Sequence, residues 1–211
     1  MTDSNIGGRG TVTHFSKWVF DKENPTYARS EYKSEIQDRQ ELGRFLHTHI
    51  QATRGWIQHI GAGKGLSSNW ELVYADDESD RRIFTASCLL VDGKPVRGKP
   101  DVVLRDKETG TIIIIERKTT GRGEDRIPIY SWPNVWVQLW CYGFMDEWAD
   151  APDVVLACQY WKRNIENMRQ LTDGAWLWNW KARPGWKRSA VQFHLECLNY
   201  FLEYGGQFIA Y

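Results

Sequence analysis

The stretch GKPDVVLRDKETGTIIIIERKTT, residues 98–120, combines a run of four isoleucines with three ionisable residues. Asp101 precedes the run, and Glu116 and Lys118 follow it. Consecutive isoleucines fill both faces of a strand, which is typical of a central strand in a sheet. Charges beside such a strand are costly to bury unless they are paired, solvated in a cleft or bound to a metal. The stretch therefore predicts either a structural ion pair at a strand end or a functional site.

The spacing of these residues favours the functional site. Glu116 and Lys118 are two residues apart on a strand, so both side chains point to the same face, and a neighbouring hairpin strand can bring Asp101 beside them. Two carboxylates suit a hard cation such as Mg²⁺, which proteins bind through one or two carboxylates plus water and phosphate oxygens. Such a cation polarises a phosphodiester and favours hydroxide formation, while Lys118 orients the water or offsets developing charge.

Hydrophobic periodicity predicts alternating helices and strands around this stretch. A helix over residues 34–60 is followed by three apolar stretches, 70–74, 83–91 and 95–104. Asp92-Gly93 separates the last two stretches and is a strong hairpin signal. A polar turn at 106–110 then leads into the isoleucine strand. We expect an antiparallel meander that ends in this buried strand, after a polar and irregular start of the chain.

The second half of the chain predicts further elements that complete the sheet. Ser131-Trp132-Pro133 resembles a helix start, and the helix should continue to about Trp148. Residues 153–161 are apolar and β-branched at their start, which predicts a strand. A strand over 175–180 and a helix over 190–204 follow.

Length and composition bound the interpretation. The 211 residues suit a single domain, in which residues 34–145 form the core and 150–211 complete the sheet and add a helix. The expected fold class is α/β, with a mixed central sheet flanked by helices. Lys plus Arg and Asp plus Glu both number 27, which excludes the strongly basic class of nucleic-acid binders. The start lacks a signal-peptide core and no apolar run reaches membrane-spanning length, so we expect a soluble, cytoplasmic protein without a membrane partner.

The four cysteines are far apart in the sequence and include no C-x-x-C pair. This spacing argues against a zinc site and against a closely spaced set of iron–sulfur ligands. We expect reduced, partly buried thiols.

Three ordered motifs together resemble a nuclease family. Pro100-Asp101, fourteen residues and then Glu116-Arg117-Lys118 look like the PD-(D/E)XK nuclease motif. Gln138 and Tyr142 in QLWCY match the Q-x-x-x-Y signature of the RecB-like branch, and GRFLH matches its G-x-x-x-H with Gly43 and His47. The resemblance covers roughly residues 34–145.

The resemblance implies a restriction-endonuclease-like core and DNA cleavage that depends on Mg²⁺ or Mn²⁺. The implied metal ligands are His47, Asp101, Glu116 and the backbone carbonyl of Arg117. Lys118 would be catalytic, and Gln138 and Tyr142 would position DNA or the lysine. Residues four apart share a helix face, which supports the last pair independently. Taken singly, His47 would be interpreted as a hydrogen-bonded core histidine.

The RecB-like motifs favour an exonuclease that acts on single strands or DNA ends in DNA repair or recombination. The chain lacks the C-terminal cysteine cluster of iron–sulfur relatives and lacks a helicase domain, so free ends or a separate helicase or recombination protein must supply the substrate. Four alternatives stay open: a structure-specific endonuclease, a restriction-type endonuclease, a catalytically silent DNA-binding or assembly module, and an RNase or defence effector. A viral origin is also compatible with the sequence.

Two further groups of residues bear on DNA binding. Arg122 and Arg126 in the loop after the isoleucine strand are candidate phosphate-binding residues, together with hairpin cations Lys94, Arg97 and Lys99. Trp176, Trp178 and Trp180 alternate, so on a strand they would share one face as a base-stacking platform. A core face or the contact of a homo-oligomer is the alternative for these rings.

Overall fold

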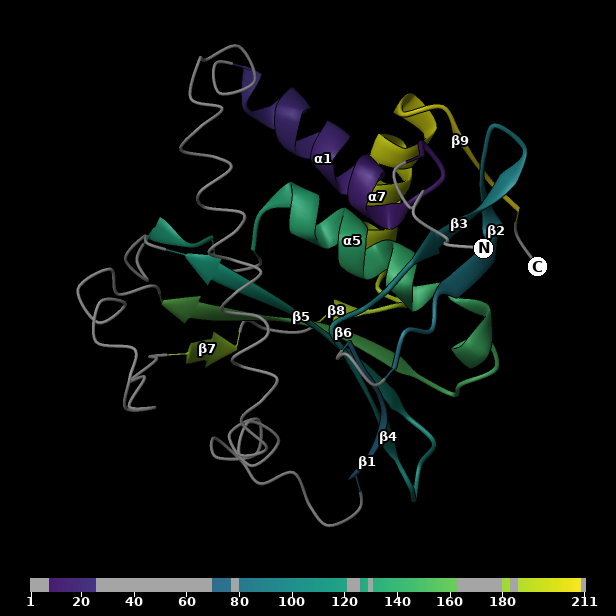
Figure 1. Ribbon diagram of the computed structural model, residues 1–211, viewed down its shortest axis with the longest axis vertical. Helices are drawn as coiled ribbons and strands as arrows, with labels where there is room; N and C mark the ends of the chain where they lie inside the picture. Colours follow the sequence, from purple (N-terminus) through teal and green to yellow (C-terminus); the bar gives the residue numbers. More distant parts are fainter. Residues whose placement is uncertain are drawn as a thin grey trace.

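A computed structural model describes residues 8–25, 70–76, 80–120, 126–128, 131–162, 180–182 and 186–209. These residues form two sheets with helices packed against them (Figure 1). The larger sheet contains both antiparallel and parallel strands. The predicted fold class, α/β with a mixed sheet flanked by helices, is confirmed.

The larger sheet has the strand order β1-β4-β5-β6-β7, and β8 also pairs with β6. Its strands are β1 (Trp70–Ala75), β4 (Val102–Asp106), β5 (Ile112–Thr120), β6 (Val154–Lys162), β7 (Trp180–Ala182) and β8 (Trp186–Lys187). β4 pairs antiparallel with both β1 and β5, whereas β5 and β6 are parallel along their whole length. The isoleucine strand is therefore central, as its apolar run predicts.

The smaller sheet has the order β3-β2-β9, formed by β2 (Phe84–Val91), β3 (Lys94–Gly98) and β9 (Gly206–Phe208). Asp92 and Gly93 form the predicted hairpin turn, and both have positive φ, 52° and 72°. The single strand expected over 95–104 is wrong, because the chain leaves β3 at Gly98 and enters β4 at Val102. Pro100, between them, has no N–H to donate to a ladder. β1 consequently pairs with β4, although β2 and β3 lie between them in the sequence. The β2–β3 hairpin belongs to the smaller sheet.

The helices are α1 (Val12–Glu23), α5 (Pro133–Gly143), a 3₁₀ turn η2 (Asp146–Trp148) and α7 (Val191–Glu203). The predicted helix ending near Trp148 is thus split into α5 and η2, and the predicted C-terminal helix is confirmed as α7. The expectation of an irregular start is wrong for α1, whose Thr11 side chain caps the helix by accepting from the His14 N–H. The predicted helix over 34–60 lies outside the described residues.

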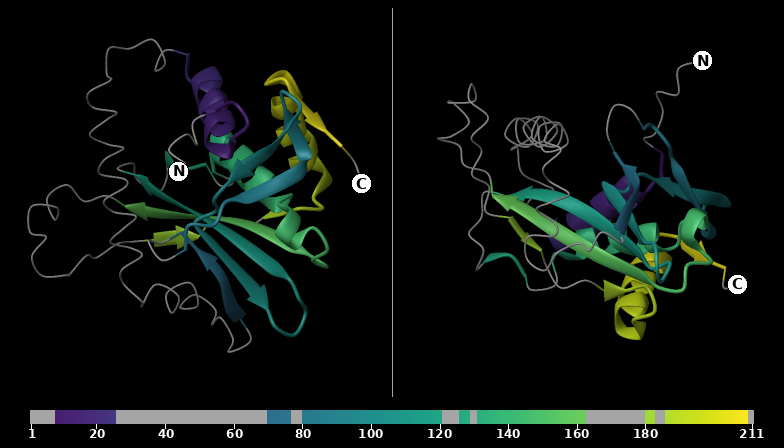
Figure 2. Two further views of the ribbon diagram at one scale, coloured as in Figure 1. Left: turned by 45° about the vertical axis from the view of Figure 1, so that its right-hand side comes forward. Right: turned by 90° about the horizontal axis from the view of Figure 1, so that it is seen from below.

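α5 lies between the larger sheet and α1 in the views of Figures 1 and 2, and it also contacts α7. Its Trp140 is fully buried, and on the sheet below, Ile112 and Ile114 of β5 are buried as well. Arg188 donates hydrogen bonds to four backbone carbonyls around the end of α5, those of Gly143, Trp148, Ala149 and Ala151. α5 is therefore held at its C-terminal end as well as along its face.

Two expectations from composition can be compared with this fold. All four cysteines are free and buried, as expected for reduced thiols. Within the described ranges, no helix is both long and apolar enough to cross a membrane.

Candidate active site

The second half of β5 carries two charged residues toward α5. Lys118 Nζ lies 2.5 Å from Glu116 Oε1 and 2.8 Å from Gln138 Oε1, so one ammonium donates to both strand and helix. Glu116 retains only 4 % exposure, and its second oxygen, Oε2, is buried without a hydrogen-bond partner in the described part of the chain. A buried carboxylate oxygen without a partner is costly, which makes Glu116 Oε2 a position that a ligand could satisfy.

Asp101 joins this cluster at the point where β4 begins. Val102 pairs with Ile115, and extending that register by two residues puts Pro100 opposite Arg117. The Arg117 N–H instead donates to Asp101 Oδ2 at 2.6 Å. The buried Asp101 carboxylate therefore takes the place of a ladder partner at the end of the β4–β5 pairing.

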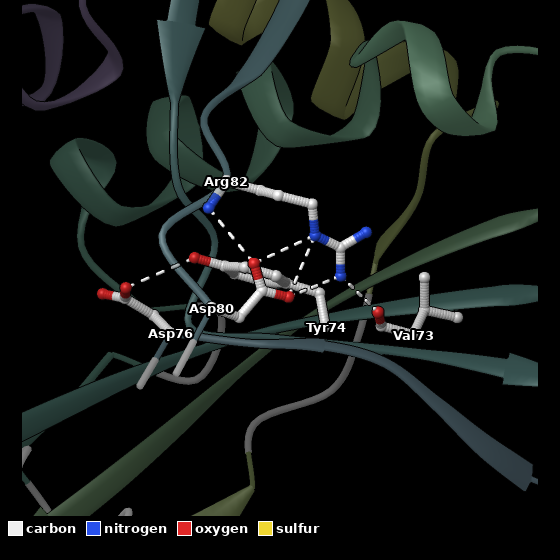
Figure 3. A network of polar contacts seen from close by, with 5 residues as sticks. All are labelled: Val73, Tyr74, Asp76, Asp80 and Arg82. Carbon is white, nitrogen blue, oxygen red and sulfur yellow. Dashed lines mark hydrogen bonds and ion pairs between the residues drawn. The ribbon is translucent and has the colours of Figure 1, made fainter. Parts of the chain in front are cut away.

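A second set of contacts fixes the backbone of Asp101. The Asp76 N–H donates to the Asp101 carbonyl at 2.9 Å, at the end of β1. The Asp76 carboxylate accepts from the Tyr74 hydroxyl at 3.3 Å (Figure 3). It also lies 3.8 Å from Lys99 Nζ. Asp101 is thus held from both neighbouring strands, β5 through its side chain and β1 through its carbonyl.

Arg82 extends this network away from the site. Its guanidinium pairs with Asp80 and donates to the Val73 carbonyl at 2.8 Å (Figure 3). It also lies over the rings of Tyr74 and Phe84. The contacts tie the segment between β1 and β2 back onto β1. They support the Tyr74–Asp76 pair and have no direct contact with Glu116.

α5 supplies two polar side chains over the cluster. Gln138 and Tyr142 are one turn apart on α5, and both are buried. Burial raises the pKa of Tyr142 well above its usual value, and the charges of Glu116 and Asp101 raise it further. The tyrosine hydroxyl is therefore neutral and close to both carboxylates. Five residues predicted from the sequence come together here: Asp101, Glu116, Lys118, Gln138 and Tyr142.

The charges of the cluster are strongly coupled. Burial and the nearby Asp101 raise the pKa of Glu116 to about 7, although Lys118 acts in the opposite direction. Burial lowers the pKa of Lys118, but Glu116 and Asp101 more than offset this, so its pKa lies above the usual value. The ammonium thus stays charged, whereas Glu116 exchanges a proton near neutral pH.

Three residues near the site were not anticipated from the sequence. The parallel register places Cys158 beside Glu116 and Tyr160 beside Lys118. The Tyr160 hydroxyl hydrogen-bonds with Ser131, a buried residue with a positive φ of 76° just before α5. Burial raises the pKa of the Cys158 thiol to about 12, which keeps it protonated and unreactive. No local pattern marks Cys158 and Tyr160 as site residues, because only the pairing of β5 with β6 places them beside Glu116 and Lys118. Ser131 comes near the site through its hydrogen bond with Tyr160.

The remaining predicted residues are placed differently. The Arg117 side chain is buried on the strand face opposite Glu116 and Lys118, and its carbonyl as a metal ligand stays a prediction. Arg126 is exposed between β5 and α5, and within the described ranges no hydrogen bond or ion pair joins it to the cluster. His47 and Arg122 lie outside the described residues, as do Trp176 and Trp178, whereas Trp180 begins β7.

The donor chemistry fits a hard divalent cation. Asp101 and Glu116 offer carboxylate oxygens, and Glu116 Oε2 is buried with no other partner among the described residues. Within those residues no set of three His, Cys, Asp or Glu side chains gathers that could hold a metal. Two carboxylates suffice for Mg²⁺ when water and substrate phosphate complete its octahedron, so the site fits a cation shared with substrate.

Comparison with known proteins adds little. No protein-family model matches this sequence, and no curated protein matches it. A solved structure titled "Crystal structure of SSO0001" is similar at 15% sequence identity and a TM-score of 0.42, covering 95% of this chain and 79% of that chain. A likeness at that TM-score carries no argument about this chain.

Proposed function

We propose that this protein is a nuclease that hydrolyses DNA phosphodiester bonds with Mg²⁺ or Mn²⁺. Its motifs resemble the RecB-like branch of the PD-(D/E)XK nucleases, which favours an exonuclease on single strands or DNA ends. The observation that carries the proposal is the convergence of two carboxylates, one lysine and a helix-borne glutamine, with Glu116 Oε2 buried and without a hydrogen-bond partner among the described residues.

The residues of the cluster have separate roles in this proposal. Asp101 and Glu116 would hold the cation, which when bound would polarise the phosphate and activate the attacking water. Lys118 donates to Gln138 as well as to Glu116, so its ammonium would keep a partner at the site if Glu116 held a cation. An ammonium there stabilises negative charge that develops on the phosphate. Tyr142 stays neutral, because burial raises its pKa, and it packs over the cluster one turn from Gln138.

A cleavage assay tests the proposal. Purified protein is incubated with end-labelled linear single-stranded, linear double-stranded and circular single-stranded DNA, with labelled RNA in parallel, in Mg²⁺, Mn²⁺ or EDTA. We expect metal-dependent release of short products from linear DNA, with circular DNA resistant. Asp101→Asn serves as the matched inactive control, because it keeps the size of the side chain and removes its charge.

Each outcome is informative. Cleavage of circular DNA would indicate an endonuclease, and cleavage of RNA alone would overturn the DNA assignment. Activity in EDTA, or equal activity of Asp101→Asn, would place the chemistry elsewhere. Failure to cleave any DNA while the protein still binds it would favour a silent DNA-binding module.

A further inference from the structure

Gly98, the last residue of β3, lies where any side chain would collide with the candidate site. A Cβ atom at this position would lie 2.9 Å from Tyr142 Cε1 and 2.7 Å from Val12 Cγ2. Gly98 is buried, and its φ is not positive, so its backbone conformation is open to other residues. Glycine is therefore required here for space, at the contact between β3, α1 and α5.

The contact with Tyr142 connects Gly98 to the charged cluster. Tyr142 lies one helical turn from Gln138 on α5, and Gln138 Oε1 accepts from Lys118 Nζ, which lies beside Glu116. A displacement of the Tyr142 ring away from β3 would therefore also move the Gln138 side chain that accepts from the Lys118 ammonium. Packed interiors transmit such displacements because they contain few voids.

The strand itself has little freedom to move away from an added methyl group. Gly98 pairs with Phe84 in the hairpin, and three residues later Asp101 is fixed through Arg117 and Asp76. Val12 is fully buried under α5. A methyl group at position 98 would therefore displace Tyr142, α1 or both.

We propose that Gly98 is a positioning residue of this site, because its missing side chain lets Tyr142 lie deep enough for Gln138 to hold Lys118 beside Glu116. The inference rests on the proposed nuclease function. Gly98 has no contact with substrate in this account and acts only through Tyr142.

Two variants separate this role from simple packing against α1. Val12→Ala removes the methyl group nearest to position 98, retains the Val12 Cβ at 3.0 Å and leaves the Tyr142 contact intact. Gly98→Ala combined with Val12→Ala should then have a kcat about 10- to 100-fold below that of Val12→Ala alone, since displacements near 1 Å can cost that much. KM for DNA should change by less than about threefold, because the loss lies in the chemical step. A kcat equal to that of Val12→Ala would overturn the inference.

A stability cycle tests the same contact without any activity. Gly98→Ala should lower Tm strongly in the parent and much less in a Val12→Ala/Tyr142→Ala background, where the Tyr142 ring and the Val12 methyl groups are gone and only the Val12 Cβ remains, 3.0 Å from the added Cβ. An equal loss of Tm in both backgrounds would overturn the inference. If the parent cleaves no DNA, the proposed function fails, while this cycle still decides whether Gly98 sets the position of Tyr142.

Discussion

The two halves of β5 share one strand but have different surroundings. Ile112 to Ile115 pair with β4 on one side and β6 on the other, and their side chains build the core. From Glu116 onward the pairing with β6 continues, whereas pairing with β4 has ended, because β4 begins at Val102. The candidate site therefore forms where the central strand β5 is no longer paired with β4.

The end of the pairing with β4 explains why charged residues are tolerated from Glu116 to the end of β5. The Arg117 N–H has no strand partner on that side and is satisfied by the Asp101 carboxylate. Polar groups of Gln138 and Tyr142 from α5 take the positions that apolar side chains have over the first half. The raised pKa of Glu116 indicates that the charged cluster is unfavourable for the fold and is offset by the apolar half.

The largest effect should come from substitutions in the polar half of β5, from Glu116 onward, and of the Asp101 carboxylate beside it. Glu116→Gln, Asp101→Asn and Lys118→Met should each reduce kcat for DNA cleavage by at least about 10²- to 10³-fold, as expected when a preorganised charged group is removed. Circular dichroism should show folded protein for all three. Turnover near the parent's value at saturating metal in any of them would misplace the site.

A second effect should appear in the pH dependence of stability. The pKa of Glu116 is about 7 in the folded protein against an ordinary 4.5, so its contribution to stability is full below pH 4.5 and is lost as pH rises through 7. In EDTA, Glu116→Gln should therefore be more stable than the parent at pH 8, by at most about 3 kcal/mol, and the difference should vanish toward pH 4.5. Urea unfolding at both pH values measures it.

The control for this pH effect is Glu71→Gln on β1. Its carboxylate is 42% exposed and lies 3.6 Å from Arg105, away from the buried cluster. The variant should keep the pH dependence of the parent. If Glu116→Gln and Glu71→Gln behaved alike, burial of Glu116 would have no energetic consequence and the contrast between the two halves would disappear.

The smallest effect should come from the apolar half. Ile114 is fully buried under α5, two residues before Glu116. Ile114→Val should lower the free energy of unfolding by about 1 kcal/mol through the lost methylene and should leave kcat unchanged. Denaturant unfolding and the cleavage assay on the same preparation give both numbers. A large loss of kcat here would show that the two halves are not separable.

Much of the site could be predicted because its signals are local. Glu116 and Lys118 share a face through strand periodicity, and Gln138 and Tyr142 share one through helix periodicity. The Asp92-Gly93 turn also follows from two adjacent residues that accept positive φ. Each of these inferences needs only the nearby sequence.

The rest depended on contacts between distant segments. Nothing near Cys158 in the sequence gives the parallel register that puts it beside Glu116. The break at Pro100 is preceded by a hairpin that belongs to a second sheet, where β2 pairs with β9 and the hairpin contacts α1, α5 and η2. Gly98 lies within the apolar stretch 95–104, and nothing near it in the sequence indicates its closeness to Tyr142.

The polar half of β5 should bind a divalent cation, and electron paramagnetic resonance of Mn²⁺ measures that binding directly. The parent should bind Mn²⁺, Mg²⁺ should compete for the same site, and Asp101→Asn/Glu116→Gln should lose that binding while Glu71→Gln retains it. Undiminished Mn²⁺ binding in the double variant, or no binding by the parent with or without DNA, would contradict the account.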